Sequence, residues 1–283
     1  MVKYNDWGKH LRLGNWLFLY AGLQSILKNT DNELWLPNYF LWNYFKNPPH
    51  ITHENTSYDE LFHFRQTNYT LEEKEYLVKY FYDNAHKEIN INLGSHLQSE
   101  KWFIDDVDYI KEKLKFKPEE VIKVREKYAP FFIRKTIGVG IRRGDFVNHG
   151  CFYQIPETWY QKALEAEFPD WQECNIIVFS DDIDWCKQYY AKTGWLFADS
   201  NNTHTHADNF KHYHNDPMEQ FILGSQMDHF VGGSSTFTWW QMWYVKNFND
   251  GKVVHSGKNL TGKCAADHHN PNYYPDNWVL YNT

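Results

Sequence analysis

The sequence predicts an α/β fold with a doubly wound parallel sheet in its C-terminal half. Two observations lead to this prediction: strand-like and helical patterns alternate after Pro130, and the run 174–179 is rich in β-branched and apolar residues. Alternating strands and helices form parallel sheets, and such a run is typical of a strand buried on both faces. The change of pattern predicts two domains, over 1–130 and 131–283.

The N-terminal half begins with apolar residues at helical spacing, which predict an amphipathic helix over 15–28. Gly14, just before it, permits unusual backbone angles, and Asn15 is able to cap the helix. The segment 34–58 is aromatic and reads as irregular. Thr70 starts a second expected helix with a capping-box pattern.

The remaining elements follow from periodicity and from turn residues. We expect helices over 101–117 and 118–127, a strand over 136–141, a helix over 156–167, a strand over 174–179, a helix over 183–192, a strand over 195–198, a helix over 217–227, a strand over 229–231, a helix over 237–247 and a strand over 252–255.

Composition excludes some classes of partner. The net charge of −7 and the pI of about 6.1 argue against nucleic-acid binding, which needs a basic surface. Any anion must therefore be held by a local group of cations. The aromatic content of 19% is high, and it suits a protein that stacks rings on sugar faces as well as one that fills its core.

The sequence shows no signal-peptide pattern and no run of 18 apolar residues, so we expect a cytoplasmic protein without a transmembrane segment. The four cysteines, Cys151, Cys174, Cys186 and Cys264, have no CxxC spacing, and we expect them to be reduced. The sequence does not indicate an oligomeric state.

Three polar clusters fall at the ends of expected strands. They are Arg142–Asp145 (RRGD), Ser180–Asp182 (SDD) and Ser234–Thr238 (SSTFT). In a doubly wound sheet, ligands bind beyond the carboxyl ends of the strands, so these clusters are candidates for one site.

The third cluster has the chemistry of a phosphate site. Ser235 and Thr236 stand at a helix N-terminus, where free N–H groups, hydroxyls and the helix dipole attract anions. An arginine from the neighbouring strand end adds a permanent charge that can bind phosphate through two hydrogen bonds. The combination predicts a diphosphate site that needs no metal, in which arginine stabilises a departing phosphate.

Each cluster also has a plainer interpretation. Adjacent arginines at a strand end are often a solvated rim, and Ser-Thr-Phe-Thr is an ordinary helix cap. Asp182 is expected to cap the helix that starts at Ile183. The histidine-rich segment (His204, His206, His212 and His214, with Asp208) has zinc-ligand chemistry, but we interpret it as a solvated loop and predict no metal site. Dinucleotide-binding and P-loop motifs are absent.

Together, these clusters resemble motifs of glycosyltransferase family 11, the alpha-1,2-fucosyltransferases. The family's HxRRGD corresponds to 140–145, its FSDD to 179–182 with Trp185 after it, and its SSFSWW to 235–240. Its N-terminal GxLGNQxFQYA is similar to 12–21, and its PxNW to 275–278. The sequence departs from these motifs at several positions, among them Gly140 in place of histidine, Trp16 and Leu19 in place of glutamine, and Thr236 and Thr238 in place of serine.

The resemblance implies a GT-B-like fold of two Rossmann-like halves, with the acceptor on the N-terminal side and the donor in the C-terminal half. It implies inverting transfer of L-fucose from GDP-L-fucose to the 2-hydroxyl of a galactoside, without a metal or other cofactor. The implied partners are a nucleotide-sugar donor and a glycan acceptor. Two alternatives stay open: another GDP-deoxyhexose as donor, or a glycan-binding protein without activity.

The resemblance also implies roles for individual residues. Arg142 would bind the β-phosphate and act catalytically, and Arg143 would brace the site or pair with Asp145. Asp145 is the candidate base, with a structural salt bridge as an equal alternative and a reaction without a strong base as a third. The implied donor-binding residues are Arg142, Arg143, Ser235, Thr236, Phe237, Thr238, Asn15 and Gly14.

Overall fold

The computed structural model describes residues 1–4, 11–52, 57–64, 68–93, 96–199, 216–268 and 270–282. The chain forms two compact units. The first comprises Met1–Lys117 and Asn270–Asp276, and the second comprises Pro118–His269 and Asn277–Thr283. The domain boundary expected at residue 130 falls within the second unit.

The first unit is built on a parallel sheet in the order β3-β2-β1-β5-β4. Its strands are β1 (Val2–Lys3), β2 (Leu34–Pro37), β3 (His50–Thr52), β4 (Glu60–Phe64) and β5 (Ile89–Leu93). Its α-helices are α1 (Leu13–Leu27), α2 (Leu71–Asp83) and α3 (Val107–Lys113). The central place of β1 and the connection through α1 to its neighbour β2 give this unit a Rossmann-like topology.

Helix α1 differs from its prediction in two respects. It is buried almost all round and is therefore not amphipathic. Its N-cap residue is Arg12, without a side-chain cap, and Asn15 lies inside the first turn. The expected cap at Asn15 is therefore wrong, because the helix begins two residues earlier, at Leu13.

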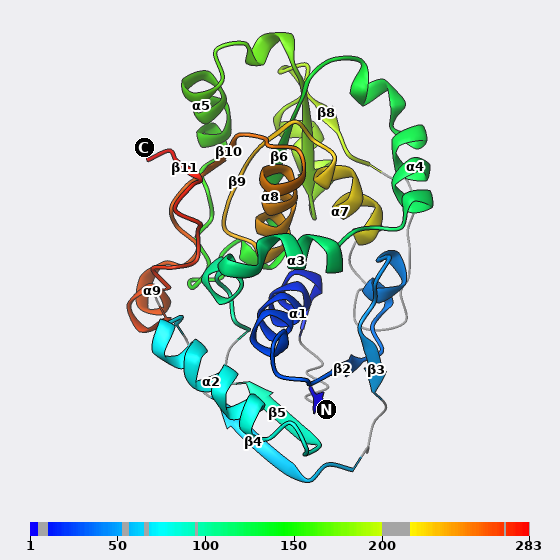
Figure 1. The fold of residues 1–283 in the computed structure, drawn as a ribbon. Helices are drawn as coiled ribbons and strands as arrows, with labels where there is room; N and C mark the ends of the chain where they lie inside the picture. The colour runs from blue at the N-terminus through cyan, green and yellow to red at the C-terminus, as the bar shows by residue number, and fades with distance from the viewer. Residues whose placement is uncertain are drawn as a thin grey trace. The chain divides into compact units, whose positions relative to one another are not determined.

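Helix α2 begins as its sequence predicts. The Thr70 hydroxyl accepts a hydrogen bond from the Glu73 N–H at 3.3 Å and donates one to the Glu73 carboxylate at 2.7 Å. The helix runs beside β4 and β5 (Figure 1), and the ring of Tyr80 stacks on Phe62 of β4 at 4.1 Å. The Thr70 cap and one aromatic stack thus fix both the start and the packing of α2.

The last part of the first unit comes from the far end of the chain. Asn272 accepts hydrogen bonds from the Ser99 hydroxyl, at its backbone carbonyl (2.7 Å), and from Lys101 Nζ, at its side chain (2.8 Å). Asn270 donates to the Gln98 carbonyl at 2.8 Å. These contacts join 270–276 to the unit formed by the first 117 residues.

The second unit is built on a parallel sheet in the order β11-β10-β9-β6-β7-β8. Its strands are β6 (Thr136–Ile141), β7 (Asn175–Ser180), β8 (Leu196–Phe197), β9 (His229–Gly232), β10 (Val253–His255) and β11 (Val279–Leu280). Its α-helices are α4 (Pro118–Lys127), α5 (Glu157–Glu167), α6 (Ile183–Tyr189), α7 (Pro217–Ser225), α8 (Thr236–Phe248) and α9 (Gly262–His268). The predicted strand over 136–141 and helix over 118–127 have the observed bounds.

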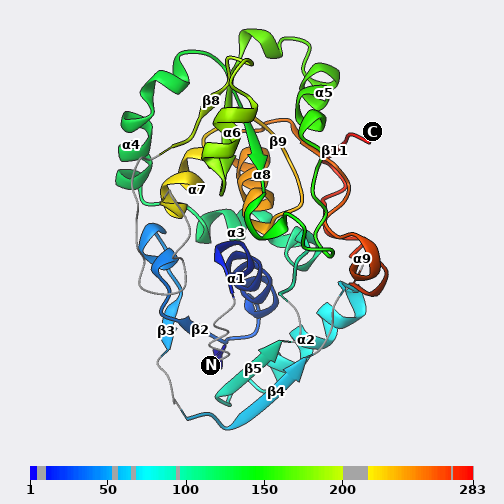
Figure 2. The ribbon, with the colours of Figure 1, turned by 180° about the vertical axis from the view of Figure 1, so that it is seen from behind.

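Helices cover both faces of this sheet (Figures 1 and 2). On one face, Ile137, Val139 and Ile141 of β6 pack in a core with residues of α5 and α6. On the other face, Gly138 lies close to Phe230 of β9 and to Met227. Gly140 lies close to Phe230 and to Thr238 of α8. The two faces of β6 therefore differ: its apolar side chains enter a large core on one face, and its glycines allow a close approach on the other, which at Gly140 is to α8.

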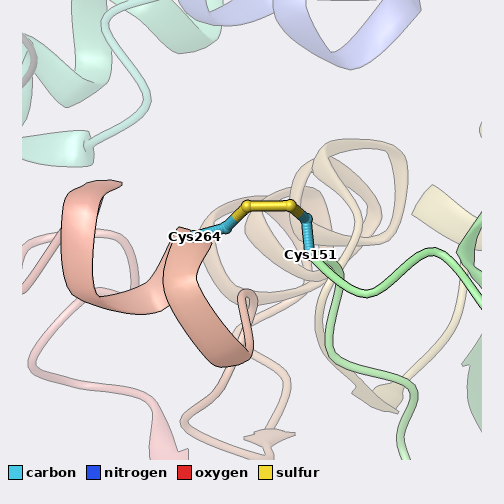
Figure 3. Close-up of a disulfide and its surroundings, with 2 residues drawn as sticks. All are labelled: Cys151 and Cys264. Carbon is cyan, nitrogen blue, oxygen red and sulfur yellow. A yellow bond between two sulfur atoms is a disulfide. The ribbon is translucent and has the colours of Figure 1, made fainter.

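A disulfide joins Cys151 to Cys264, with the two Cα atoms 5.1 Å apart. Figure 3 shows that it links the loop after β6 to helix α9. The expectation of four reduced thiols is therefore wrong, because the fold brings together two cysteines 113 residues apart. Cys174 and Cys186 are free thiols, and burial raises the pKa of Cys186 to about 12. The cytoplasmic location stays a prediction.

Two other expectations concern absences. Within the described residues, no helix is long and apolar enough to cross a membrane, and no group of three or more histidine, cysteine or acidic residues is arranged to hold a metal ion. The histidine-rich segment around Asp208 lies outside the described residues, so its interpretation as a solvated loop stays a prediction.

Candidate functional site

The site lies at the point where the second sheet reverses its strand order. From β6 the chain adds β7 and β8 on one side, and then β9, β10 and β11 on the other. Ligands of doubly wound sheets bind in the crevice at such a switch point, beyond the carboxyl ends of the strands. The register pairs Ile141 with Ser180 and Val139 with Val231, so the three predicted polar clusters all begin at this edge.

Arg142, directly after β6, is held by two carboxylates. Its Nη1 lies 2.9 Å from Oδ2 of Asp181, and its Nη2 donates to Oδ1 of Asp145 at 2.6 Å. The Arg142 side chain is only 14% exposed, so its charge is largely buried at the sheet edge rather than on a solvated rim. Asp145 is far more exposed, at 39%, and so is the partner that is easier to exchange for a ligand.

Asp181 is the buried centre of this cluster. Its side chain is 8% exposed, and its Oδ1 accepts the backbone N–H of Arg143 at 2.9 Å. Burial raises the pKa of Asp181, whereas the charge of Arg142 lowers it. A Cβ atom on Gly144 would lie under 3.0 Å from Oδ2 of Asp181, so only glycine leaves room for this carboxylate. The RRGD motif thus encloses an acid from the neighbouring strand.

Arg143 contacts a different set of residues. Its Nε lies 3.3 Å from the Asp182 carboxylate, its Nη1 lies 3.3 Å from Glu157, and its guanidinium lies 3.3 Å from the ring centroid of Trp185. Two ion pairs and a cation–π contact make Arg143 a brace between α5 and α6. The alternative in which Arg143 pairs with Asp145 is wrong, because Asp145 pairs with Arg142.

The predicted cap at Asp182 also needs correction. Asp182 does occupy the N-cap position of α6, but its side chain makes no capping hydrogen bond. Its carboxylate binds Arg143 instead, and its own N–H donates to the Ser180 hydroxyl at 3.0 Å.

The start of α8 supplies hydrogen-bond donors. Ser235 is the N-cap, and its hydroxyl accepts the N–H of Thr238 at 3.2 Å. The N–H groups of Thr236 and Phe237 have no acceptor in the part of the chain that the structure describes. The first turn of a helix carries such unpaired donors together with a partial positive charge, which favours an anion. The ring of Phe237 packs against Phe221 of α7 instead, so its contribution here is its backbone N–H.

The end of β6 and the start of α8 are in direct contact. A Cβ atom on Gly140 would lie under 3.0 Å from both Cγ2 and Oγ1 of Thr238. Arg142 follows Gly140 by two residues, and Ser235 precedes Thr238 by three. The structure therefore brings the strand end that precedes the arginine cluster into contact with the first turn of α8.

Two predicted donor-binding residues belong to the first unit. Gly14 and Asn15 belong to α1 in the first unit, where the Asn15 side chain accepts a hydrogen bond from Gln98 at 2.9 Å. Their part in donor binding stays a prediction.

Sequence reasoning missed the roles of Asp181 and Glu157. Asp181 was recognised as part of a polar strand end, but neither its burial nor its pairing with Arg142 was predicted. Glu157, at the start of α5, carried no motif that could reveal it.

Comparison with known families agrees with the geometry. The sequence profile of glycosyl transferase family 11 matches residues 129–279, which is more than half of the chain and contains all three polar clusters. The chain belongs to glycosyl transferase family 11. The match starts near the beginning of the second unit and ends within β11.

Two curated relatives match about half of the chain. An alpha-1,2-colitosyltransferase of Escherichia coli is 27% identical over 164 residues, which cover 56% of this family 11 chain and 52% of the relative. The O-antigen biosynthesis glycosyltransferase WbnK of Escherichia coli is 25% identical over 151 residues, covering 51% and 44%. The chain thus spans about half the length of the curated relatives it matches.

Solved structures share the fold over nearly the whole chain. POFUT1 in its apo form matches with a TM-score of 0.56 and 11% identity, covering 90% of this chain and 96% of that one. POFUT1 in complex with GDP-fucose gives 0.54 and 13%, covering 88% and 94%. FUT1 of Arabidopsis thaliana in complex with GDP gives 0.53 and 12%, covering 91% and 70%. The predicted fold class, α/β and GT-B-like with two Rossmann-like halves, is confirmed.

Proposed function

We propose that this chain is an inverting glycosyltransferase that moves L-fucose from GDP-L-fucose to the 2-hydroxyl of a galactoside. The observation that carries the proposal is the contact of Gly140, two residues before Arg142, with Thr238 in the first turn of α8 at the switch point of the second sheet. A fixed cation and unpaired N–H groups at one sheet edge suit a diphosphate leaving group. Family membership supports sugar transfer as the reaction.

The chemistry needs a stabilised leaving group above all. The bond between the anomeric carbon and the β-phosphate oxygen breaks, and GDP leaves with the electron pair. Arg142, Ser235, Thr236 and the N–H of Phe237 stabilise the charge that develops on the β-phosphate. The acceptor hydroxyl attacks from the opposite face of the sugar and loses its proton, which inverts the anomeric centre. These cationic and N–H groups carry out the step that a metal ion performs in other transferases.

Asp145 is the candidate acceptor of that proton. Its ion pair with Arg142 supports the other role considered from the sequence, a structural salt bridge that orients the arginine. In that case the proton leaves late in the reaction without a strong base.

Thermal unfolding with GDP, ADP and UDP tests the proposal. We expect GDP at about 100 times its Kd to stabilise the fold by about 2.7 kcal/mol, and ADP and UDP to have little effect. Arg142→Ala abolishes the GDP effect. Arg134→Ala is the matched control, because Arg134 is an exposed arginine just before the opposite end of β6. A wild-type protein that GDP does not stabilise contradicts the proposal.

Donor and acceptor panels then define the substrates. GDP-fucose is compared with other GDP-deoxyhexoses, among them activated colitose, because one relative is an alpha-1,2-colitosyltransferase. Release of GDP with a β-galactoside acceptor supports the proposed transfer. Glycan binding without any release of GDP indicates a binding protein instead.

A further inference from the structure

Thr238 fills a space left by two glycines on neighbouring strands. A Cβ atom on Gly140 of β6, or on Gly232 of β9, would lie under 3.0 Å from the Cγ2 methyl of Thr238. Gly232 also lies close to the Gly140 carbonyl, since its Cβ would stand 3.5 Å from that oxygen. Thr238 itself is 5% exposed. Its methyl is thus seated in a socket formed by the backbones of β6 and β9.

The polar atoms of Thr238 bind the helix cap. Its N–H donates to the Ser235 hydroxyl at 3.2 Å, and its own hydroxyl lies 3.1 Å from that same oxygen. One side chain therefore joins the two strands, through its methyl, to the N-cap of α8, through its hydroxyl. This link sets the position of the α8 first turn, with the N–H groups of Thr236 and Phe237, relative to the end of β6.

We propose that Thr238 is a positioning residue for the diphosphate site and that it acts with Gly140 as one interlocked pair. The proposal rests on the proposed function, because it concerns the groups that would hold the diphosphate. It also explains two departures from the family motifs, Gly140 and Thr238, by one packing contact. Gly140 is then the necessary complement of the threonine methyl, since any larger residue at 140 displaces the start of α8.

A double-mutant cycle tests the pair. Gly140→Ala, Thr238→Ser and the double variant are compared with the wild type by Tm and by Kd for GDP, measured calorimetrically. We expect Gly140→Ala to lower the Tm by about 3–10 °C and to weaken GDP binding about tenfold. Thr238→Ser removes the methyl, the nearest atom to the added Cβ, but keeps the hydroxyl oxygen, which also lies under 3.0 Å from it. The double variant therefore recovers part of both losses.

Gly138→Ala is the matched control. Gly138 lies two residues earlier on the same face of β6, but its Cβ would meet Phe230 and Met227 rather than the start of α8. We expect it to lower the Tm by a similar amount, to change the Kd for GDP less than about twofold, and to gain nothing from Thr238→Ser.

The outcomes separate the two proposals. Additive effects of Gly140→Ala and Thr238→Ser on the Tm overturn the interlocked pair. Coupled Tm values with an unchanged Kd for GDP overturn the positioning role alone. Absence of GDP binding by the wild type overturns the proposed function together with the positioning role, whereas the Tm cycle still reports on the packing of the pair.

Discussion

The carboxylate of Asp181, at the end of β7, lies 2.9 Å from the guanidinium of Arg142, at the end of β6. Arg142 therefore owes its position at the switch point to an acid on the neighbouring strand. The next acid along, Asp182, is 41% exposed and binds Arg143 instead. Two adjacent aspartates thus hold two adjacent arginines, one through a buried carboxylate and one through an exposed carboxylate.

Asp181→Asn tests the buried pair. Asparagine can still accept the Arg143 N–H, but it leaves the charge of Arg142 poorly balanced in a site with little solvent. We expect the free energy of unfolding to fall by about 2–3 kcal/mol, measured by denaturant titration. Asp182→Asn is the matched control and is expected to cost about 0.5 kcal/mol, because exposed ion pairs contribute little. Equal effects of the two variants would show that the burial of Asp181 does not matter.

Gly144→Ala is expected to act on the same carboxylate. The added methyl would overlap Oδ2 of Asp181 and force it away from Arg142, which destabilises the fold by about 1–3 kcal/mol. In an Asp181→Ala background the obstruction is gone, so the same substitution has little effect. Denaturant titration of both single variants and the double variant measures the coupling, and additive values contradict it.

Asp145→Asn separates the two roles of that residue. Because Asp145 is already paired with Arg142 at 2.6 Å, we expect kcat to fall less than about tenfold and the pH–rate profile to keep its shape. If Asp145 is the catalytic base, the loss reaches about 100-fold or more and the limb of the profile that reports its titration disappears.

Removal of the disulfide is expected to destabilise the second unit. The bond closes a loop of 113 residues, which in the chain-entropy description contributes about 5 kcal/mol. Melting in the presence of a reductant measures the loss. The variant Cys151→Ser/Cys264→Ser should melt at the same lower temperature with or without reductant. Thiol titration of the unreduced, denatured protein should find Cys174 and Cys186 alone, and four reactive thiols would contradict the bond.

His255, at the end of β10, should make stability depend on pH. Burial lowers its pKa to about 4 from an ordinary value of 6.5. Between these values the unfolded chain binds more protons than the folded one, so the stability that His255 contributes is present above pH 6.5 and is lost as the pH falls toward 4. The loss is about 3 kcal/mol. Denaturant titrations at several pH values should show a smaller loss for His255→Asn, and identical curves would refute the assignment.

The sequence predicts the central strands of the second sheet well because they are largely buried, whereas the two-residue, partly exposed β11 was not predicted. β6 consists of six buried residues between Lys135 and Arg142, and its predicted bounds are the observed ones. The first sheet was not predicted strand by strand. β1 has only two residues, and β4 carries the apolar Leu61 at an exposed position. Neither sequence therefore shows the alternation of apolar and polar residues that indicates a half-buried strand.

The candidate site was predicted in outline for a similar reason. Polar residues at strand ends and a capped helix are local patterns, so Arg142 and Ser235 could be found in the sequence. Which of Asp181 and Asp182 turns inward depends on the backbone at the end of β7, and the partner of Cys151 depends on a contact across 113 residues. Neither leaves a local signal.

The return of residues 270–276 to the first unit has a consequence for how the protein is made. The first 117 residues leave the ribosome long before Asn272, which binds Ser99 and Lys101, is synthesised. The first unit therefore stays incomplete while the second unit is translated. For the same reason neither unit can be expressed as one continuous segment of the chain. A stop codon ahead of Asn270 would remove residues 270–276 from the first unit. It would also remove Trp278, which packs on Trp239, from the second unit.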